Sequence, residues 1–131
     1  MRIYRATDRI QVKIGDITFH ISPLSYRNKI ALLNEITRDG GVESQSEAAI
    51  AMQTIRYSVK KVDGLTYWDN EPTEITLDEN GDVSETSMIE LMQLESVNQL
   101  ASTCVMLMAK LEDPKLKGVE VKFPGDGIKK K

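Results

Sequence analysis

The stretch IQVKIGDITFHISPLSYRNKIALLNEI, residues 10–36, decides the fold that this sequence predicts. Apolar and polar residues alternate over residues 10–14 and again over residues 17–21, which is typical of strands with one buried face. The Gly-Asp pair between them suits a two-residue hairpin turn with a positive φ at its first central position. A Ser-Pro-Leu-Ser segment then opens an amphipathic helix. We therefore expect an N-terminal β-hairpin that leads directly into a helix.

The composition is that of an ordinary small domain. The chain has 131 residues, of which 40% are hydrophobic and 28% charged, and its net charge is −3. This length supports one hydrophobic core, and the acidic balance argues against general nucleic-acid affinity. The longest apolar run, residues 105–109, is far too short for a membrane span, and the N-terminal residues lack the apolar run of a secretory signal. The single cysteine, Cys104, has no partner for an intramolecular disulfide, which favours a reducing cytoplasm.

Hydrophobic periodicity predicts three helices. The first begins near Ser22 or Ser25 and ends near residue 37, where an Arg-Asp-Gly-Gly segment stops it. The second begins at the capping box of residues 44–47 and ends near residue 62. The third begins at the capping-box spacing that starts with Ser87 and ends near residue 111. The predicted core-facing side chains are Tyr26, Ile30, Leu33 and Ile36 in the first helix, Ala48, Met52, Ile55, Val59 and Val62 in the second, and Ile89, Val97, Leu100, Ala101, Cys104, Leu107, Met108 and Leu111 in the third.

The segment between the second and third helices is the least regular part of the chain. Residues 65–68 and 75–77 are predicted to be short strands, with an acidic turn at residues 78–82. Residues 119–123 alternate and would add a further strand near the C-terminus.

The predicted architecture is an α+β domain, mainly helical, with three helices, an N-terminal β-hairpin and short strands in the middle segment. We expect residues 1–113 to form a single globular domain. We expect residues 114–131 to form a C-terminal segment whose last residues are flexible.

Charge is distributed unevenly along the chain. Residues 63–109 contain ten acidic residues and no lysine or arginine, whereas residues 110–131 contain seven lysines and four acidic residues. One interpretation is a solvated acidic loop followed by a solvated tail. The other is an acidic face that steers the encounter with a basic partner.

The candidate motifs for catalysis or metal binding each lack residues that the chemistry requires. The acidic turn matches the opening of a calcium-binding EF-hand loop, but Val83 and Ile89 stand where that loop needs glycine and glutamate. His20 is the only histidine, which excludes a histidine-based metal cluster, and strand alternation turns it to solvent, opposite Phe19. Cys104 has no CxxC neighbour and shares a helix face with leucines, so we interpret it as a buried small hydrophobe. We expect no enzymatic activity, no cofactor and no metal.

The third predicted helix carries apolar residues outside its core-facing stripe. Extra apolar residues around a helix indicate either burial at the centre of the domain or an interaction surface. Methionine suits both, as a gap-filler and as an adaptable contact. Our hypothesis is that off-stripe residues and nearby acids bind a second copy or another protein. The candidate partner-binding residues are Leu91, Met92, Leu94, Val105, Met106, Asp78, Asp82, Glu85 and Glu95.

The hairpin pattern Ile-x-Val-x-Ile-Gly-Asp-Ile-x-Phe of residues 10–19 and the Pro-Leu-Ser of residues 23–25, followed by helices, resemble the tail assembly chaperones of long-tailed bacteriophages. The resemblance covers residues 1–40 in pattern, together with overall size and helical content. It implies a non-enzymatic protein that engages tail-tube subunits and the tape-measure protein in the host cytoplasm and is absent from the finished virion. It also implies a longer form made by ribosomal frameshifting, and adenine-rich codons for residues 129–131, all lysine, would suit such a shift.

Two other classes of protein stay open. One is a structural virion component, such as a tail-tube, terminator or connector subunit, although such proteins are usually richer in strands. The other is a small regulatory or nucleic-acid-binding module. The acidic remainder of the chain would repel the phosphates of a nucleic acid and so oppose this binding. Neighbouring genes for tail-tube and tape-measure proteins would favour the chaperone. The basic arm of the nucleic-acid-binding alternative would consist of Arg2, Tyr4, Arg5, Arg9 and Lys13.

Overall fold

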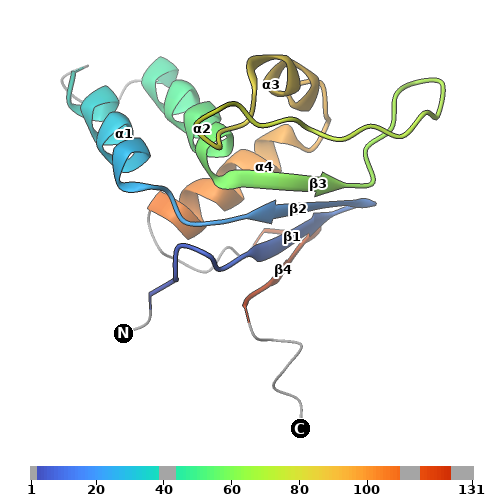
Figure 1. Ribbon diagram of the computed structural model, residues 1–131, viewed down its shortest axis with the longest axis horizontal. Coiled ribbons are helices and arrows are strands. Elements are labelled where there is room, and N and C mark those ends of the chain that lie inside the picture. The colour runs from blue at the N-terminus through green and yellow to red at the C-terminus, as the bar shows by residue number, and fades with distance from the viewer. Residues whose placement is uncertain (1–2, 39–43, 110–115, 125–131) are drawn as a thin grey trace, which may run out of the picture.

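One antiparallel sheet and a layer of helices make up the structure, a computed structural model that describes residues 3–38, 44–109 and 116–124 (Figure 1). The chain is therefore an α+β protein, as predicted. The sheet has the order β3-β2-β1-β4. Its strands are β1 (Ile10–Ile14), β2 (Ile17–Ile21), β3 (Val59–Asp63) and β4 (Val119–Lys122). The helices are α1 (Tyr26–Arg38), α2 (Ser44–Ser58), α3 (Glu85–Leu91), α4 (Val97–Cys104) and its π-helical continuation η1 (Val105–Ala109).

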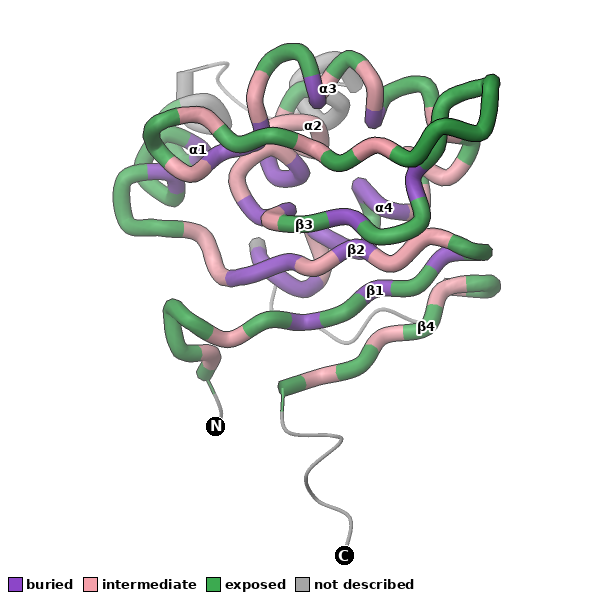
Figure 2. Tube along the Cα trace, turned by 45° about the vertical axis from the view of Figure 1, so that its right-hand side comes forward, coloured by how far each residue is buried: buried purple, intermediate pink, exposed green. Residues whose placement is uncertain are grey.

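The predicted N-terminal hairpin is confirmed. β1 pairs with β2 in antiparallel register, with Ile14 opposite Ile17, and Gly15 has a φ of +63° in the turn. Val12, Ile14 and Phe19 are buried on the face that the helices cover, whereas the alternate residues Gln11, Lys13 and His20 lie on the other face. Figure 2 shows the same alternation of buried and exposed residues along β1. The predicted strand near the C-terminus is also present, because β4 pairs with β1.

The second helix ends earlier than predicted, and its last predicted turn is a strand. α2 stops at Ser58 and runs directly into β3, which pairs with β2. The pairing register shifts between His20 and Ile21, so Val59 and Val62 are both buried although they stand three residues apart. A spacing of three between buried residues is typical of a helix. The irregular pairing of β3 therefore produces a helix-like pattern of buried residues, which is why the sequence predicts a helix to residue 62.

The third predicted helix is broken into two. Residues 92–96 separate α3 from α4. They form four-residue turns, one of which is closed by the hydrogen bond from the Leu94 N–H to the Leu91 carbonyl. Ser84, and not Ser87, caps α3: its hydroxyl accepts a bond of 3.2 Å from the Ser87 N–H. The break changes the direction of the chain, which leaves Ile89 exposed although it was predicted to face the core.

The first helix presents the opposite face to that predicted. Its apolar residues Tyr26 and Leu33 are 83% and 50% exposed, and Ile30 is also exposed. Asn28 and Leu32 are buried instead. The physical reason is a buried hydrogen bond of 2.8 Å from the Asn28 amide to the Asp82 carboxylate, which fixes the rotation of α1.

The middle segment contains isolated bridges where short strands were predicted. Thr66 pairs with Pro72 and Leu77 pairs with Val83, each as a single antiparallel bridge. The acidic turn is present, with the Gly81 N–H bonded to the Asp78 carbonyl at 3.0 Å.

The core contains many of the residues predicted for it in the later helices, whereas Met52 and Val97, also predicted, are only partly buried and pack against it. Leu100 and Cys104 of α4 and Ile55 of α2 are fully buried. The rest of the buried apolar cluster is formed by Ile10, Val12, Ile14, Phe19, Ile21, Val59, Val62, Leu65, Val83, Leu91, Ala101, Leu107 and Met108.

Several predictions concern parts that the structure does not describe. They are the glycine stop at residues 39–41, the domain boundary at residue 113 and the lysines at residues 129–131. The same holds for Leu111, and for the side chains of Ile36, Ala48 and the capping box at residues 44–47. Within the described ranges, the helices are too short or too polar to cross a membrane.

Candidate functional site

The single tryptophan lies on a turn that projects beyond the end of β3, at the right of Figure 1. Trp68 is 100% exposed. The turn is nevertheless well bonded: the Tyr67 N–H donates to the Glu71 carbonyl and the Asn70 N–H donates to the Tyr67 carbonyl, both at 2.9 Å. Asn70 has a φ of +69°, a conformation that asparagine adopts more readily than most residues. Trp68 is thus presented to solvent by an ordered turn.

This turn is tied to α3. The Tyr67 hydroxyl donates a bond of 3.0 Å to the Glu90 carboxylate and accepts one of 3.1 Å from the Thr73 hydroxyl. On α3 and at its C-cap, Ile89 and Met92 are 61% and 55% exposed. The Tyr67–Glu90 hydrogen bond therefore links two segments that each expose apolar side chains. We call the surface of these two segments the acidic aromatic surface: Tyr67, Trp68, Ile89 and Met92, with Asp69, Glu71, Glu85 and Glu90.

Among the described residues, no cation pairs with the carboxylates of this surface. Residues 63–109 contain no lysine or arginine. In the described parts of the chain, no ion pair involves Asp69, Glu71, Glu85 or Glu90. The surface therefore combines apolar side chains with negative charge that the described residues do not pair, and this favours a positively charged partner.

The predicted partner-binding residues are dispersed in the structure. Met92 and Glu85 belong to the acidic aromatic surface. Glu95 is exposed, but it lies on the α3–α4 connection beside a separate groove. Leu91 and Asp82 are buried inside the protein, so neither side chain is presented to a partner in this structure. The remaining four predicted residues have partly buried side chains: Leu94, Val105, Met106 and Asp78.

Sequence reasoning missed the aromatic residues of the surface. The sequence pattern predicts a short strand for Tyr67 and Trp68 and a core position for Ile89, whereas all three side chains are exposed. The available signal was the tryptophan itself, because it precedes an Asp-Asn-Glu-Pro turn and has acids on one side. A large aromatic residue in a polar turn often marks a binding surface.

The loop of residues 78–83 is held in place by hydrogen bonds and an ion pair. Asp78 accepts bonds from the Asp82 and Asn80 N–H groups and from the Arg56 guanidinium. These bonds, first the one from Asp82, keep the pKa of Asp78 below its usual value. The Lys60 ammonium donates to the Gly81 carbonyl at 2.6 Å, and burial lowers the pKa of that lysine. These contacts fasten the loop to α2 and β3.

The two candidate reactive residues have structural surroundings. His20 lies on the sheet face opposite Phe19, as predicted, and its Nε2 is 2.7 Å from the Asp63 carboxylate. This hydrogen bond lowers the pKa of Asp63. Cys104 is fully buried, as predicted, and burial raises the pKa of its thiol to about 12. Burial also keeps the thiol away from solvent, which is typical of a structural cysteine.

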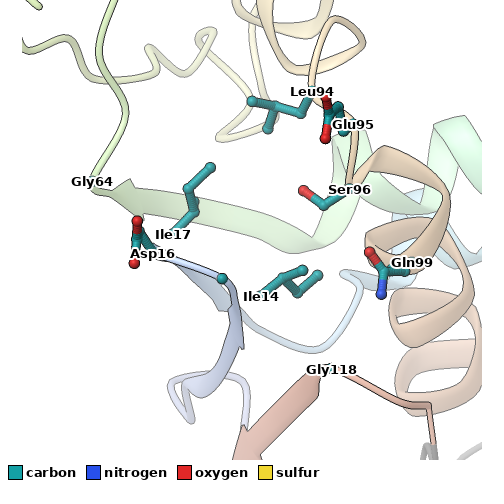
Figure 3. A pocket seen from close by; sticks show the side chains of 10 residues that line it. Ile14, Asp16, Ile17, Gly64, Leu94, Glu95, Ser96, Gln99 and Gly118 are labelled. Atoms are coloured by element: carbon teal, nitrogen blue, oxygen red, sulfur yellow. The ribbon is translucent and has the colours of Figure 1, made fainter.

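A groove of about 760 Å³ lies between the hairpin turn, the end of β3 and the start of α4 (Figure 3). Ile14, Ile17 and Leu94 give it apolar walls. Its two carboxylates, Asp16 and Glu95, lie on opposite sides (Figure 3). None of the described lining residues is a histidine, cysteine or lysine, so the groove resembles a contact site for an apolar side chain more than a reaction centre.

Comparisons with known proteins give no relative from which a role could be transferred. No protein-family model, curated protein or solved structure matches this chain.

Proposed function

We propose that this protein acts by binding other proteins through the acidic aromatic surface, and that it is a tail assembly chaperone of a long-tailed bacteriophage. In this proposal it engages the tail-tube subunit and the tape-measure protein in the host cytoplasm. The observation that carries the binding proposal is Trp68, which is fully exposed on an ordered turn. Tryptophan and tyrosine are the residues most enriched among binding hot spots.

The energy available from Trp68 is large enough to matter. An aromatic side chain of this kind buries about 150–250 Å² in an interface. At about 25 cal/mol per Å², that corresponds to roughly 4–6 kcal/mol before the costs of association are subtracted. Because the turn is already hydrogen-bonded, little ordering entropy is lost when Trp68 docks. The surrounding carboxylates then favour segments of a partner that carry lysine or arginine.

The more specific identity is supported by the sequence resemblance and by the fold class. The hairpin of residues 10–21 leads through Pro-Leu-Ser into α1, in the order that the resemblance implies. A virion component would be found in purified particles, whereas a chaperone would be found only in infected cells. A nucleic-acid-binding module would have to place phosphates beside a chain whose net charge is −3, which costs electrostatic energy.

Binding can be measured through Trp68 itself, because it is the only tryptophan. Titration with the purified tail-tube and tape-measure proteins of the same gene cluster, carrying Trp→Phe replacements, should shift the Trp68 emission to shorter wavelength as the side chain leaves water. Trp68→Ala should weaken binding by about 2 kcal/mol or more, which is roughly a 30-fold rise in Kd measured by calorimetry.

The matched control is Ile3→Ala, which removes another highly exposed apolar side chain from a different part of the chain. It should leave Kd unchanged. If neither tail protein binds, the chaperone proposal is wrong. If both bind and Trp68→Ala binds equally well, the protein binds through another surface.

A genetic observation tests the identity separately. The chaperone proposal predicts a slippery run of adenines in the codons for residues 129–131, with an overlapping reading frame beyond it. Recoding these lysines with AAG should remove a longer product and preserve the short one. Absence of both the adenine run and the second frame would favour the virion-component alternative.

A further inference from the structure

α1 carries a second exposed apolar region, on its outward face. Tyr26, Ile30 and Leu33 are spaced by four and three residues, so they form one stripe along the helix, opposite the buried Asn28 and Leu32.

Positive charges flank this stripe. With 100° between successive residues of a helix, Lys29 lies on one side of the stripe and Arg27 on the other, and both side chains are exposed. The part of α1 whose side chains are described, residues 26–34, contains no acidic residue. We call this region the basic apolar face: Tyr26, Ile30 and Leu33, with Arg27 and Lys29.

α1, which carries the basic apolar face, and the turn that carries Trp68 lie at opposite ends of the protein, with α3 between them. In Figure 1, α1 is at the left and the turn that follows β3 projects at the right, along the longest axis. Figure 2 shows the same separation from a second direction. One copy of the chain therefore does not bring its own two regions together, although they are complementary in charge and both expose apolar side chains.

We propose that copies of this chain associate head to tail, with the basic apolar face of one copy docked on the acidic aromatic surface of the next. This inference rests on the proposed function in one respect, since it uses the same acidic surface as a protein-docking site. It names a second copy as the occupant.

Charge decides between the two kinds of self-association. A symmetric contact between two α1 helices would place Arg27 and Lys29 of one copy near those of the other, and a symmetric contact between two acidic surfaces would oppose their carboxylates. Both arrangements are repulsive. Only the head-to-tail contact joins opposite charges, and it also lets an arginine or lysine lie against the ring of Trp68. A head-to-tail contact leaves one surface of each kind unpaired at the ends, so it produces a ring or an open filament.

The arrangement has a consequence for the proposed function. A basic segment of a tail protein would compete with α1 of the neighbouring copy for Trp68. Self-association would therefore cover the exposed aromatic residues until such a partner displaces the neighbour.

Two variants with different surface changes test the proposal. In the first, Arg27→Glu and Lys29→Glu reverse the charge of the basic apolar face and leave Trp68 in place. In the second, Trp68→Ala removes the centre of the acidic aromatic surface and leaves α1 in place. All three positions are exposed, so urea unfolding should show midpoints equal to that of the unaltered protein.

Sedimentation velocity over a concentration series should show that the unaltered protein forms assemblies, which dissociate as salt is raised. Each variant alone should self-associate at least about tenfold more weakly. An equimolar mixture should form a 1:1 dimer that does not grow, because only one productive pair of surfaces remains. Only the first variant contains tryptophan, so a shift of its emission to shorter wavelength on adding the second variant reports docking of α1 on Trp68.

Three results would overturn the proposal: a protein that stays monomeric at all concentrations and low salt, a first variant that still dimerises alone, or a mixture without dimer and without a shift in emission. The proposed function is judged by a different measurement. If the protein is monomeric and Trp68 still responds to the tail-tube or tape-measure protein, head-to-tail association fails and the docking function stands. If the protein is monomeric and Trp68 responds to neither tail protein, both proposals fail.

Discussion

The rotation of α1 rests on the buried bond between Asn28 and Asp82, and replacing Asn28 by alanine tests it. Asn28 is 6% exposed and Asp82 is 2% exposed, and the amide donates to the carboxylate at 2.8 Å. Hydrogen bonds to charged groups contribute about 1.5–3 kcal/mol, and loss of the donor leaves a buried carboxylate short of one partner. Alanine is a better helix former than asparagine by up to about 0.7 kcal/mol, which offsets part of the loss.

A matched control is available on the same helix. Asn34 is exposed, so Asn34→Ala carries the gain in helix propensity without the buried bond. The free energy of unfolding of Asn28→Ala should therefore lie about 1.5–3 kcal/mol below that of Asn34→Ala. In urea, with a slope of about 2 kcal/mol per M, the two midpoints should differ by about 1 M.

A double-mutant cycle identifies the partner. In an Asp82→Ala background, the difference between the two asparagine variants should shrink to a few tenths of a kcal/mol, since there is no carboxylate left to satisfy. A difference below about 0.5 kcal/mol in the unaltered background would refute the reasoning. It would mean that Asn28 does not face the loop at Asp82, and the basic apolar face would then be assigned to the wrong side of α1.

Three further predictions concern the core and its titrating groups. Leu100→Ala should lower the free energy of unfolding by about 2–5 kcal/mol in urea denaturation, because Leu100 is fully buried, and a loss under about 0.5 kcal/mol would contradict that burial. Cys104 should react with a thiol reagent only as fast as the protein unfolds, so rapid labelling of the native protein would show an accessible thiol. NMR titration should give Asp78 a pKa below 3.8. Because the pKa of Asp78 is lower in the folded than in the unfolded protein, its ionised form stabilises the fold at every pH above the unfolded pKa. This contribution should persist at neutral pH and disappear as the pH falls through the folded pKa.

The parts of the fold that sequence predicts well are those with local causes. The hairpin follows from strict alternation around a Gly-Asp turn, and both are visible within residues 10–21. The burial of Cys104 follows from its place among leucines on one helix face. Neither prediction needs knowledge of a distant segment.

The errors have long-range causes. The apolar stripe of α1 was assigned to the core because apolar residues usually face inward, but the choice of face depends on Asp82, which lies far along the chain. The spacing of Val59 and Val62 imitated a helix because the pairing of β3 with β2 is irregular. Pairing partners are not visible in a single sequence, so that irregularity was not predictable.

The candidate site was predictable in charge and not in position. The absence of lysine and arginine from residues 63–109 allowed two interpretations, a solvated acidic loop or an acidic face for a basic partner. The exposure of Trp68 and Ile89 depends on how the turn after β3 and the break after α3 place them. Pattern rules assign large apolar residues to the interior by default, and so they pass over those that remain outside.

The position of β1 in the sheet has a consequence for synthesis on the ribosome. β1 pairs with β2 at once, but its other edge is completed only by β4, from residues 119–122. At ordinary translation rates, that edge waits on the order of ten seconds for its partner strand. During this time the nascent chain exposes unpaired backbone groups beside apolar side chains, which is the template on which chains aggregate. Chains that terminate before β4 should therefore be enriched in the insoluble fraction when the protein is expressed, whatever the stability of the complete fold.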